Sequence, residues 1–115
     1  MADIEVIQRI VLEKGYRLTG HASVEAMKDG ISPADIRHAI FHGKIIEEYP
    51  ERDYPDIETV LIYAKLPANI PAHVVVDVIV EQSVIVVTAY VPDRTRWVAS
   101  QKRKKVNADE MYQML

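Results

Sequence analysis

His73 and Tyr90 are the two residues whose types and positions could support acid–base chemistry. They belong to two segments rich in β-branched residues, around positions 74–80 and 84–91, which only three residues separate. Such segments are typical of strands, and the short connection predicts an antiparallel hairpin. With a two-residue turn at positions 81 and 82, His73 lies opposite Tyr90. There the imidazole could accept a proton and the phenol could donate one.

Side chains alternate between the two faces of a strand, so this register predicts one apolar and one mixed face for the hairpin. The mixed face is expected to hold His73, Val75, Asp77, Val86, Thr88 and Tyr90. The apolar face is expected to hold Val74, Val76, Val78, Val80, Ile85, Val87, Ala89 and Val91. We therefore expect core on one side and a candidate site on the other, with Thr88 as a substrate contact. The alternative is that His73 and Tyr90 only pack as a cross-strand aromatic pair.

Three further residues are candidates for the same site. His21 begins a predicted helix, where free N–H groups could bind a phosphate and its imidazole could act as a second acid–base group. The alternative is a capping or first-turn histidine without a chemical role. Arg94 and Arg96 follow the second strand of the hairpin and could hold a phosphate group.

Other groups are weaker candidates. His38 and His42 are four residues apart on a predicted helix, a spacing at which two imidazoles can share a metal ion. No third ligand is near them in the sequence, so we expect surface histidines and predict neither a metal nor a cofactor. Glu47 and Glu48 are consecutive in a predicted strand, so their carboxylates should point to opposite faces rather than form a pair.

Composition and charge limit the classes of protein. The chain has 115 residues, no cysteine and a net charge of −3. We expect a single domain over residues 1–115, with a core at about 16–97, no membrane span, no signal peptide and a cytoplasmic location. Residues 93–115 hold six basic and three acidic side chains, whereas residues 1–92 hold eight and fourteen. The basic C-terminal tail, 98–115, is either a solvated end or an arm that attracts phosphate or an acidic partner.

The periodicity predicts helices first and strands afterwards. Helices are expected over residues 3–14 and 21–28, and a third starts at Ser32-Pro33 and closes at His42-Gly43. Val24 and Met27 are expected to face inward, and Ala22 is a further candidate for that face. Strands are expected at 44–49, 58–65, 74–80 and 84–91, and a short helix at 94–100. The fold class is therefore α+β, with two or three N-terminal helices packed on a four-stranded antiparallel sheet.

Residues 16–97 resemble a family of small bacterial and archaeal proteins, the domain-of-unknown-function family four-two-five-eight. The signature T-x-Y-x-P-D, which begins at Thr88, is followed by Trp97. The other matching residues are His21-Ala22, Met27, Gly30-Ile31-Ser32, Gly43, Ile45-Ile46-Glu47, Tyr49-Pro50, Leu61 and His73-Val74-Val75. The resemblance implies a toxin encoded beside a zinc-finger or helix-turn-helix antitoxin. It also implies a RelE/barnase-like two-layer layout similar to that of RelE-like ribonuclease toxins.

The resemblance implies cleavage of RNA by attack of the ribose 2′-hydroxyl on the neighbouring phosphate, without a metal. No catalytic set of that group maps onto this sequence, so the candidates remain His21, His73 and Tyr90, with Arg94, Arg96 and Thr88 as substrate contacts. The partners would be an RNA substrate and a cognate antitoxin. The acidic overall charge argues against RNA binding. The alternative function is a non-catalytic protein-interaction domain, which could be a homodimer.

Overall fold

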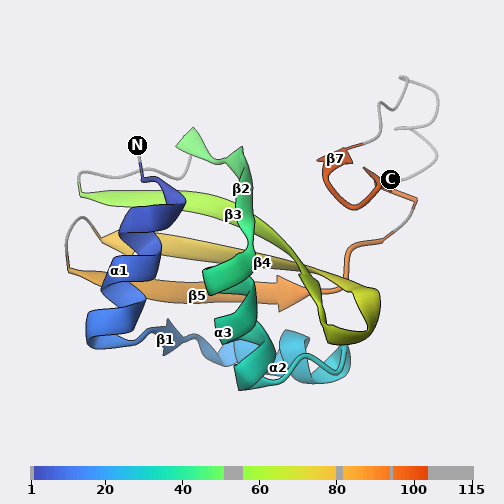
Figure 1. Ribbon diagram of the computed structural model, residues 1–115, viewed down its shortest axis with the longest axis horizontal. Helices are drawn as coiled ribbons and strands as arrows, with labels where there is room; N and C mark the ends of the chain where they lie inside the picture. Colours follow the sequence, from blue (N-terminus) through green and yellow to red (C-terminus); the bar gives the residue numbers. More distant parts are fainter. Residues whose placement is uncertain (1, 51–55, 80–81, 94, 104–115) are drawn as a thin grey trace.

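The computed structural model describes the chain except residues 1, 51–55, 80–81, 94 and 104–115 (Figure 1). The described residues begin with α1 (Ile4–Lys14), the short strand β1 (Arg17–Leu18), α2 (Gly20–Lys28) and α3 (Pro33–His42). The long strands follow: β2 (Lys44–Glu48), β3 (Ile57–Leu66), β4 (Ile70–Ile79) and β5 (Ser83–Tyr90), with the 3-10 turn η2 (Pro67–Asn69) before β4. A small hairpin, β6 (Trp97–Val98) and β7 (Lys102–Arg103), comes last.

The α+β class is confirmed, and the composition of the sheet is corrected. Strands β2 to β5 form the expected antiparallel meander. However, β1 adds to the edge of β5 in parallel, which gives a five-stranded mixed sheet in the order β1-β5-β4-β3-β2. The sequence could not predict this strand, because two residues are too few to show an alternation of polar and apolar side chains.

The helix boundaries follow from their caps. The Asp3 side chain accepts from the backbone N–H of α1, the Thr19 hydroxyl accepts from that of α2, and Ser32 forms a capping box with Asp35 at α3. Each cap satisfies N–H groups that have no partner inside the helix. No helix among the described residues is long and apolar enough to cross a membrane.

The predicted inward face of α2 is right for Ala22 and wrong for Val24 and Met27. Val24 and Met27 are 52% and 76% exposed, whereas Ala22 and Ala26 are buried. Helix α2 packs against β5, and these two alanines lie four residues apart on one helical face. A methyl side chain lets a helix lie close to a strand, so the small residues rather than the large ones face the sheet.

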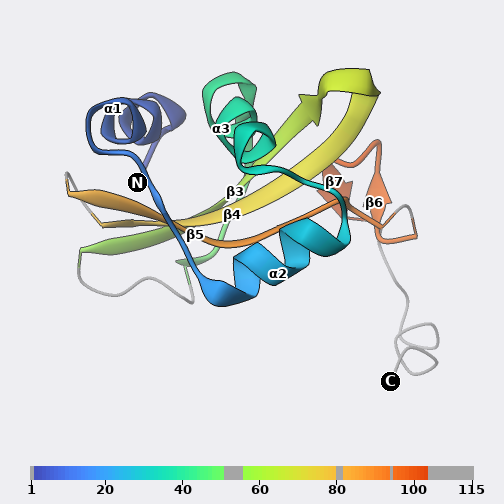
Figure 2. The same cartoon turned by 90° about the horizontal axis from the view of Figure 1, so that it is seen from below.

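The main core lies between the sheet and the helices. In Figure 2, α1 and α3 cover one face of the sheet and α2 runs beside β5. Ile7, Val11, Ile36 and Ile40 pack there on the inward residues of β3, β4 and β5, and these four side chains are at most 1% exposed. A second, smaller cluster of Leu61, Val75 and Trp97 is separate from the main core.

The register of the β4–β5 hairpin agrees with the prediction at one end and differs at the other. His73 lies opposite Tyr90 as predicted, whereas Ser83 lies opposite Ile79 instead of Val80. The pairing shifts by one residue within the hairpin, so the difference near the turn does not extend to the candidate site.

The shift is a β-bulge in which Val87 is the extra residue of β5. A bulge lets two residues on one strand oppose one on the other, and it reverses the alternation of faces beyond that point. Val86 is therefore buried in the main core, and Val87 packs against the small cluster. The predicted faces of Ile85, Val86 and Val87 are wrong for this reason, while those of Thr88 and Tyr90 are unaffected.

The short helix predicted at 94–100 is wrong. Residues Trp97–Val98 and Lys102–Arg103 instead pair as antiparallel strands. Ala99 and Ser100 in the connection have φ angles of 51° and 62°, which no right-handed helix contains. The described part of the basic tail is thus a hairpin, and its remainder, 104–115, lies outside the described residues.

Gly43, which ends α3, is expected to tolerate no side chain. A Cβ there would meet the Ala39 carbonyl oxygen, Ile62 Cγ2 at 2.6 Å and the Tyr63 carbonyl oxygen at 2.7 Å. We expect Gly43→Ala to lower the free energy of unfolding by about 2 kcal/mol or more, as over-packing does. Gly20→Ala is the matched control, because nothing lies within 4 Å of a Cβ at that position. Urea unfolding followed by circular dichroism measures both, and equal stabilities would contradict the steric argument.

Candidate functional site

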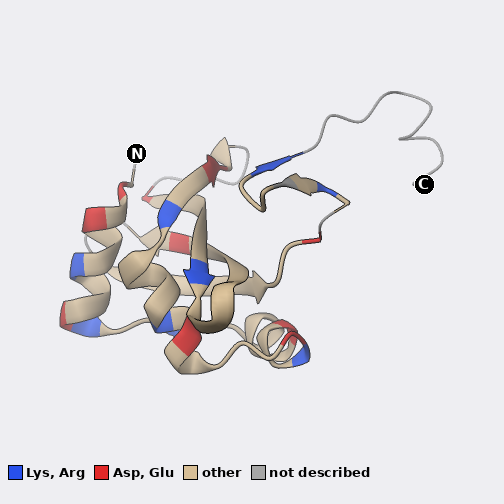
Figure 3. Ribbon diagram, turned by 45° about the vertical axis from the view of Figure 1, so that its right-hand side comes forward, with Lys and Arg blue, Asp and Glu red and all other residues tan. Residues whose placement is uncertain are grey.

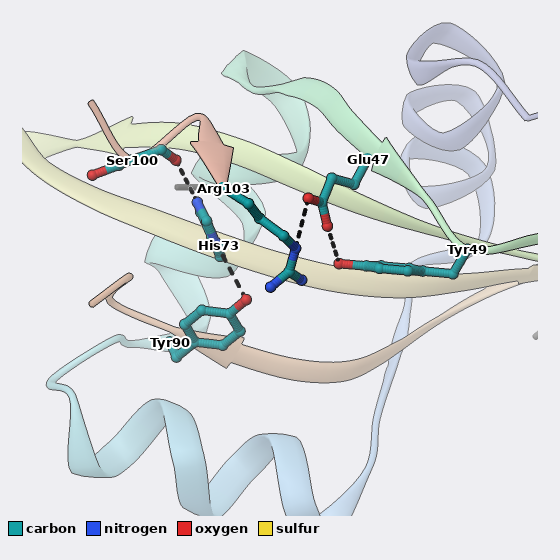
Figure 4. A network of polar contacts seen from close by, with 6 residues as sticks. All are labelled: Glu47, Tyr49, His73, Tyr90, Ser100 and Arg103. Carbon is teal, nitrogen blue, oxygen red and sulfur yellow. Dashed lines mark hydrogen bonds and ion pairs between the residues drawn. The ribbon is translucent and has the colours of Figure 1, made fainter. Parts of the chain in front are cut away.

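His73 is the centre of a polar network on the sheet face that is opposite the main core (Figure 4). It comes from β4 and is 0% exposed. Its Nδ1 lies 3.3 Å from the Tyr90 hydroxyl on β5, and its Nε2 lies 2.5 Å from the backbone oxygen of Ser100 in the β6–β7 connection. The Trp97 ring lies edge-on to the imidazole, with 4.4 Å between ring centroids. The histidine is thus enclosed between the sheet and the small hairpin.

The hydrogen-bond partners determine which nitrogen of His73 carries the proton. A carbonyl oxygen can only accept, so Nε2 carries the hydrogen and donates it to Ser100. In the neutral imidazole Nδ1 is then an acceptor, and the Tyr90 hydroxyl donates to it. Both ring nitrogens are therefore engaged, and the one that faces the hairpin is a donor in this state.

Burial determines the charge of this pair. It lowers the pKa of His73, and this effect exceeds the opposing effects of the Ser100 carbonyl and the Glu47 carboxylate. Burial also raises the pKa of the Tyr90 phenol. Low polarity disfavours the charged form of each group, so near neutral pH His73 is uncharged and Tyr90 keeps its proton.

Glu47, Tyr49 and Arg103 form the second half of the network. The Tyr49 hydroxyl donates to one carboxylate oxygen of Glu47 at 2.7 Å, and Arg103 Nε donates to the other at 2.8 Å. The guanidinium of Arg103 also lies over the Trp97 ring, 4.6 Å from its centroid. Burial and the bond to Glu47 raise the pKa of Tyr49, so this phenol too stays protonated.

A second β-bulge directs Glu47 toward His73. The register of β2 on β3 shifts between Ile45 and Glu47, so that Glu47 pairs with Leu61. Ile45 packs against the main core, and Ile46 packs against the small cluster on the opposite face. Strict alternation would return Glu47 to the core face, and the bulge prevents this. A carboxylate thus lies on the same face as the histidine.

The structure brings only some of the predicted site residues together. His73 and Tyr90 are in contact, and Thr88 lies two pairs further along, opposite Val75. His21 is exposed in the first turn of α2, and among the described residues it makes no hydrogen bond or ring contact with His73. Arg96 is exposed and pairs with Asp93 at 3.9 Å. Arg94 lies outside the described residues.

The sequence did not predict that Glu47, Tyr49 and Arg103 belong to the site. Glu47 and Tyr49 are two residues apart in one extended segment, a spacing that places side chains on the same face. That signal was available, but strict alternation could not show which face they would share. Arg103 had no such signal, because its position depends on the turn at Ala99 and Ser100.

Charge around the site is mixed. In Figure 3, β7 is basic over its whole length, and acidic residues lie on β2. Arg103 and Glu47 neutralise each other at 2.8 Å, with their side chains 56% and 21% exposed. Lys102 is exposed on the same strand. Arg103, the cation whose charge acts on His73, therefore comes from the C-terminal hairpin.

The two histidines considered for a metal lie elsewhere. The rings of His38 and His42 stack on the outer face of α3, with centroids 4.4 Å apart. With Leu12, Arg37 and Phe41 they line an open depression of about 410 Å³ between α1 and α3. No cluster of three or more His, Asp or Glu side chains suited to a metal occurs in the described part of the chain.

Comparison with known proteins gives one match. A family model described as a domain of unknown function, DUF4258, matches residues 18–91, which is more than half of the chain. The chain belongs to this family. Among curated proteins and among solved structures, no significant match is found.

The DUF4258 match covers only part of the network. Glu47, Tyr49, His73 and Tyr90 lie inside the matched residues 18–91. Arg103 lies beyond them, on the hairpin that encloses the histidine. The family region therefore contains the imidazole, the phenols and the carboxylate, while the cation comes from the C-terminal extension of this DUF4258 domain.

The buried imidazole is expected to make stability depend on pH. Because the pKa of His73 is lowered in the folded state, the unfolded chain binds more protons just below the ordinary value of 6.5. The part of the free energy of unfolding that comes from keeping His73 neutral is therefore complete above that pH. It is lost as the pH falls toward the folded-state pKa. Urea titrations at pH values from about 5 to 8 measure it.

His73→Gln is the informative variant, because its amide can still donate to Ser100 but does not titrate. We expect its unfolding free energy to vary less over this pH range than that of the wild type. His21→Ala, at an exposed position, should retain the wild-type profile. An unchanged profile in His73→Gln would contradict the assignment to His73.

Proposed function

We propose that this DUF4258 domain is a metal-independent endoribonuclease whose active site is the polar face around His73. The supporting observation is that two hydrogen-bonded groups meet on either side of the Trp97 ring, one with a neutral imidazole and a protonated phenol, the other with a phenol, a carboxylate and a guanidinium. These are the groups that attack of the 2′-hydroxyl on the adjacent phosphate requires: a base, an acid and a positive charge. The resemblance to small toxins with a RelE/barnase-like layout favours the same chemistry. The proposed partners are an RNA substrate and a cognate antitoxin.

In the proposed reaction, His73 removes the proton of a ribose 2′-hydroxyl. The oxygen attacks the adjacent phosphorus, a new O–P bond forms, and the bond from phosphorus to the 5′-oxygen of the next nucleotide breaks. The products are a 2′,3′-cyclic phosphate and a 5′-hydroxyl, whose proton a phenol such as Tyr90 supplies. Arg103 stabilises the charge that develops on the phosphate oxygens. Arg94 and Arg96 are proposed as further phosphate contacts, Thr88 as a contact for the ribose or phosphate, and His21 as a second acid–base group from α2.

A non-catalytic interaction domain, monomeric or homodimeric, is the second candidate. The observation that favours it is the complete burial of His73, with both ring nitrogens already bonded. A histidine in that state also serves as a structural link between the sheet and the hairpin. The net charge of −3 favours this candidate as well, because affinity for RNA normally comes from cationic surface.

Cleavage of RNA by the purified protein in the presence of a chelator tests the proposal. Free RNA and mRNA on ribosomes are both used as substrates. We expect His73→Gln to lower the rate by about 10²–10⁴-fold, as loss of a general base does. Tyr90→Phe, which removes a single hydroxyl, is expected to lower it by a smaller factor.

Circular dichroism shows whether each variant is folded, and His21→Ala shows whether α2 contributes to the reaction. Wild-type activity in His73→Gln would contradict the assignment of the base. No cleavage of either substrate by the folded wild type would contradict the ribonuclease and leave the interaction domain, whose self-association is then measured by sedimentation.

A further inference from the structure

We propose that the β6–β7 hairpin, residues 97–103, is an autoinhibitory strap that holds His73 in its inactive tautomer and moves off the imidazole to admit a single-stranded RNA, while Arg103 passes from Glu47 to an RNA phosphate and stays at the site. The consequence for catalysis rests on the proposed function, whereas the movement of the hairpin does not.

The hairpin places a hydrogen-bond acceptor where a substrate group would need to be. The Ser100 carbonyl accepts from His73 Nε2, which keeps the hydrogen on that nitrogen. A base must present a lone pair to the 2′-hydroxyl. In this tautomer Nε2, the nitrogen that faces the hairpin, carries a hydrogen and has no free lone pair. Once the carbonyl leaves, the hydrogen can move to Nδ1 and be donated to the Tyr90 oxygen. Nε2 then becomes an acceptor. The strap thus blocks the site both sterically and through the tautomer.

The hairpin is held by side-chain contacts and not by the ladder of the main sheet. In the described residues β6 and β7 pair with each other as a separate two-stranded sheet and do not extend the main sheet. Beyond the Ser100 carbonyl, the hairpin is held by Trp97, which lies on His73 and packs with Leu61 and Val75, and by the pair of Arg103 with Glu47. Ion pairs with such exposure contribute little to stability. A phosphate of the RNA can replace Glu47 on Arg103, so binding compensates for the contact that is lost.

The connection itself is strained. Ala99 and Ser100 have φ angles of 51° and 62°, a region that favours glycine and asparagine. Two successive residues with side chains in that region raise the free energy of the closed hairpin. Because of this strain, a substitution of Ser100, whose side chain takes no part in the network, can favour or disfavour the closed state.

Ser100→Gly and Ser100→Pro form a matched pair for the test. Glycine adopts a positive φ without strain and keeps the carbonyl that His73 donates to, so it should stabilise the closed hairpin. Proline requires a φ near −65° and cannot adopt this turn, so it should open the hairpin. The readout is the fluorescence of Trp97, which is the only tryptophan of the chain and is 5% exposed.

Acrylamide quenching of Trp97 fluorescence is measured in the full chain, with the urea-unfolded protein as the upper limit. We expect a severalfold higher quenching constant in Ser100→Pro than in the wild type, and an equal or lower one in Ser100→Gly. The ¹⁵N shifts of the His73 ring should move toward the other tautomer in Ser100→Pro only. Far-UV circular dichroism confirms that the main sheet is intact. Equal quenching and equal ring shifts in the two variants would overturn the strap.

The RNA cleavage assay separates this inference from the proposed function. If both hold, cleavage is fastest in Ser100→Pro and slowest in Ser100→Gly. If quenching changes as expected but no variant cleaves RNA, the movement of the hairpin is supported and the ribonuclease is contradicted. Cleavage at the same rate in all three proteins would support the ribonuclease and contradict the inhibitory role of the strap.

Discussion

The long antiparallel pairing of β3 with β4 is the constraint on which the rest of the structure depends. It runs without a shift from Ile57 opposite Ile79 to Leu66 opposite Ile70. Because side chains alternate along both strands, this pairing commits every second residue to the helix-covered core and the others to the opposite face. Both the core under α1 and α3 and the position of His73 follow from it. A slip of one residue would bury the polar face and expose the valines.

Two bulges on the outer strands modify this pattern, and both bear on the site. In β2 the bulge turns Glu47 toward the histidine, and in β5 it lets Val84 and Val86 join the core while Tyr90 keeps its place opposite His73. Without them, the carboxylate would point into the core face. Bulges are common next to functional sites because they redirect a side chain at the cost of one unpaired residue. That association supports the view that this face has a role beyond packing.

The same face shows why catalysis and structure are hard to separate in this DUF4258 domain. A buried imidazole needs partners for both nitrogens, and Tyr90 and Ser100 supply them. The resulting unit is stable in the closed state but leaves no nitrogen free for chemistry. The proposed strap resolves this conflict, because the hairpin is strained at Ala99 and Ser100 and its strands pair with each other outside the main sheet.

The sequence by itself determined the helices, the third of them through its start at Ser32-Pro33, and the four antiparallel strands, through their β-branched residues. It also placed His73 opposite Tyr90. These features depend on neighbours in the chain, and local periodicity and capping report them directly. Only the tertiary structure decided the parallel strand β1, the faces beyond the two bulges, the exposure of Val24 and Met27 on α2 and the arrival of Ser100 and Arg103 over the histidine. Each of these depends on contacts between residues far apart in the sequence, for which no local pattern exists.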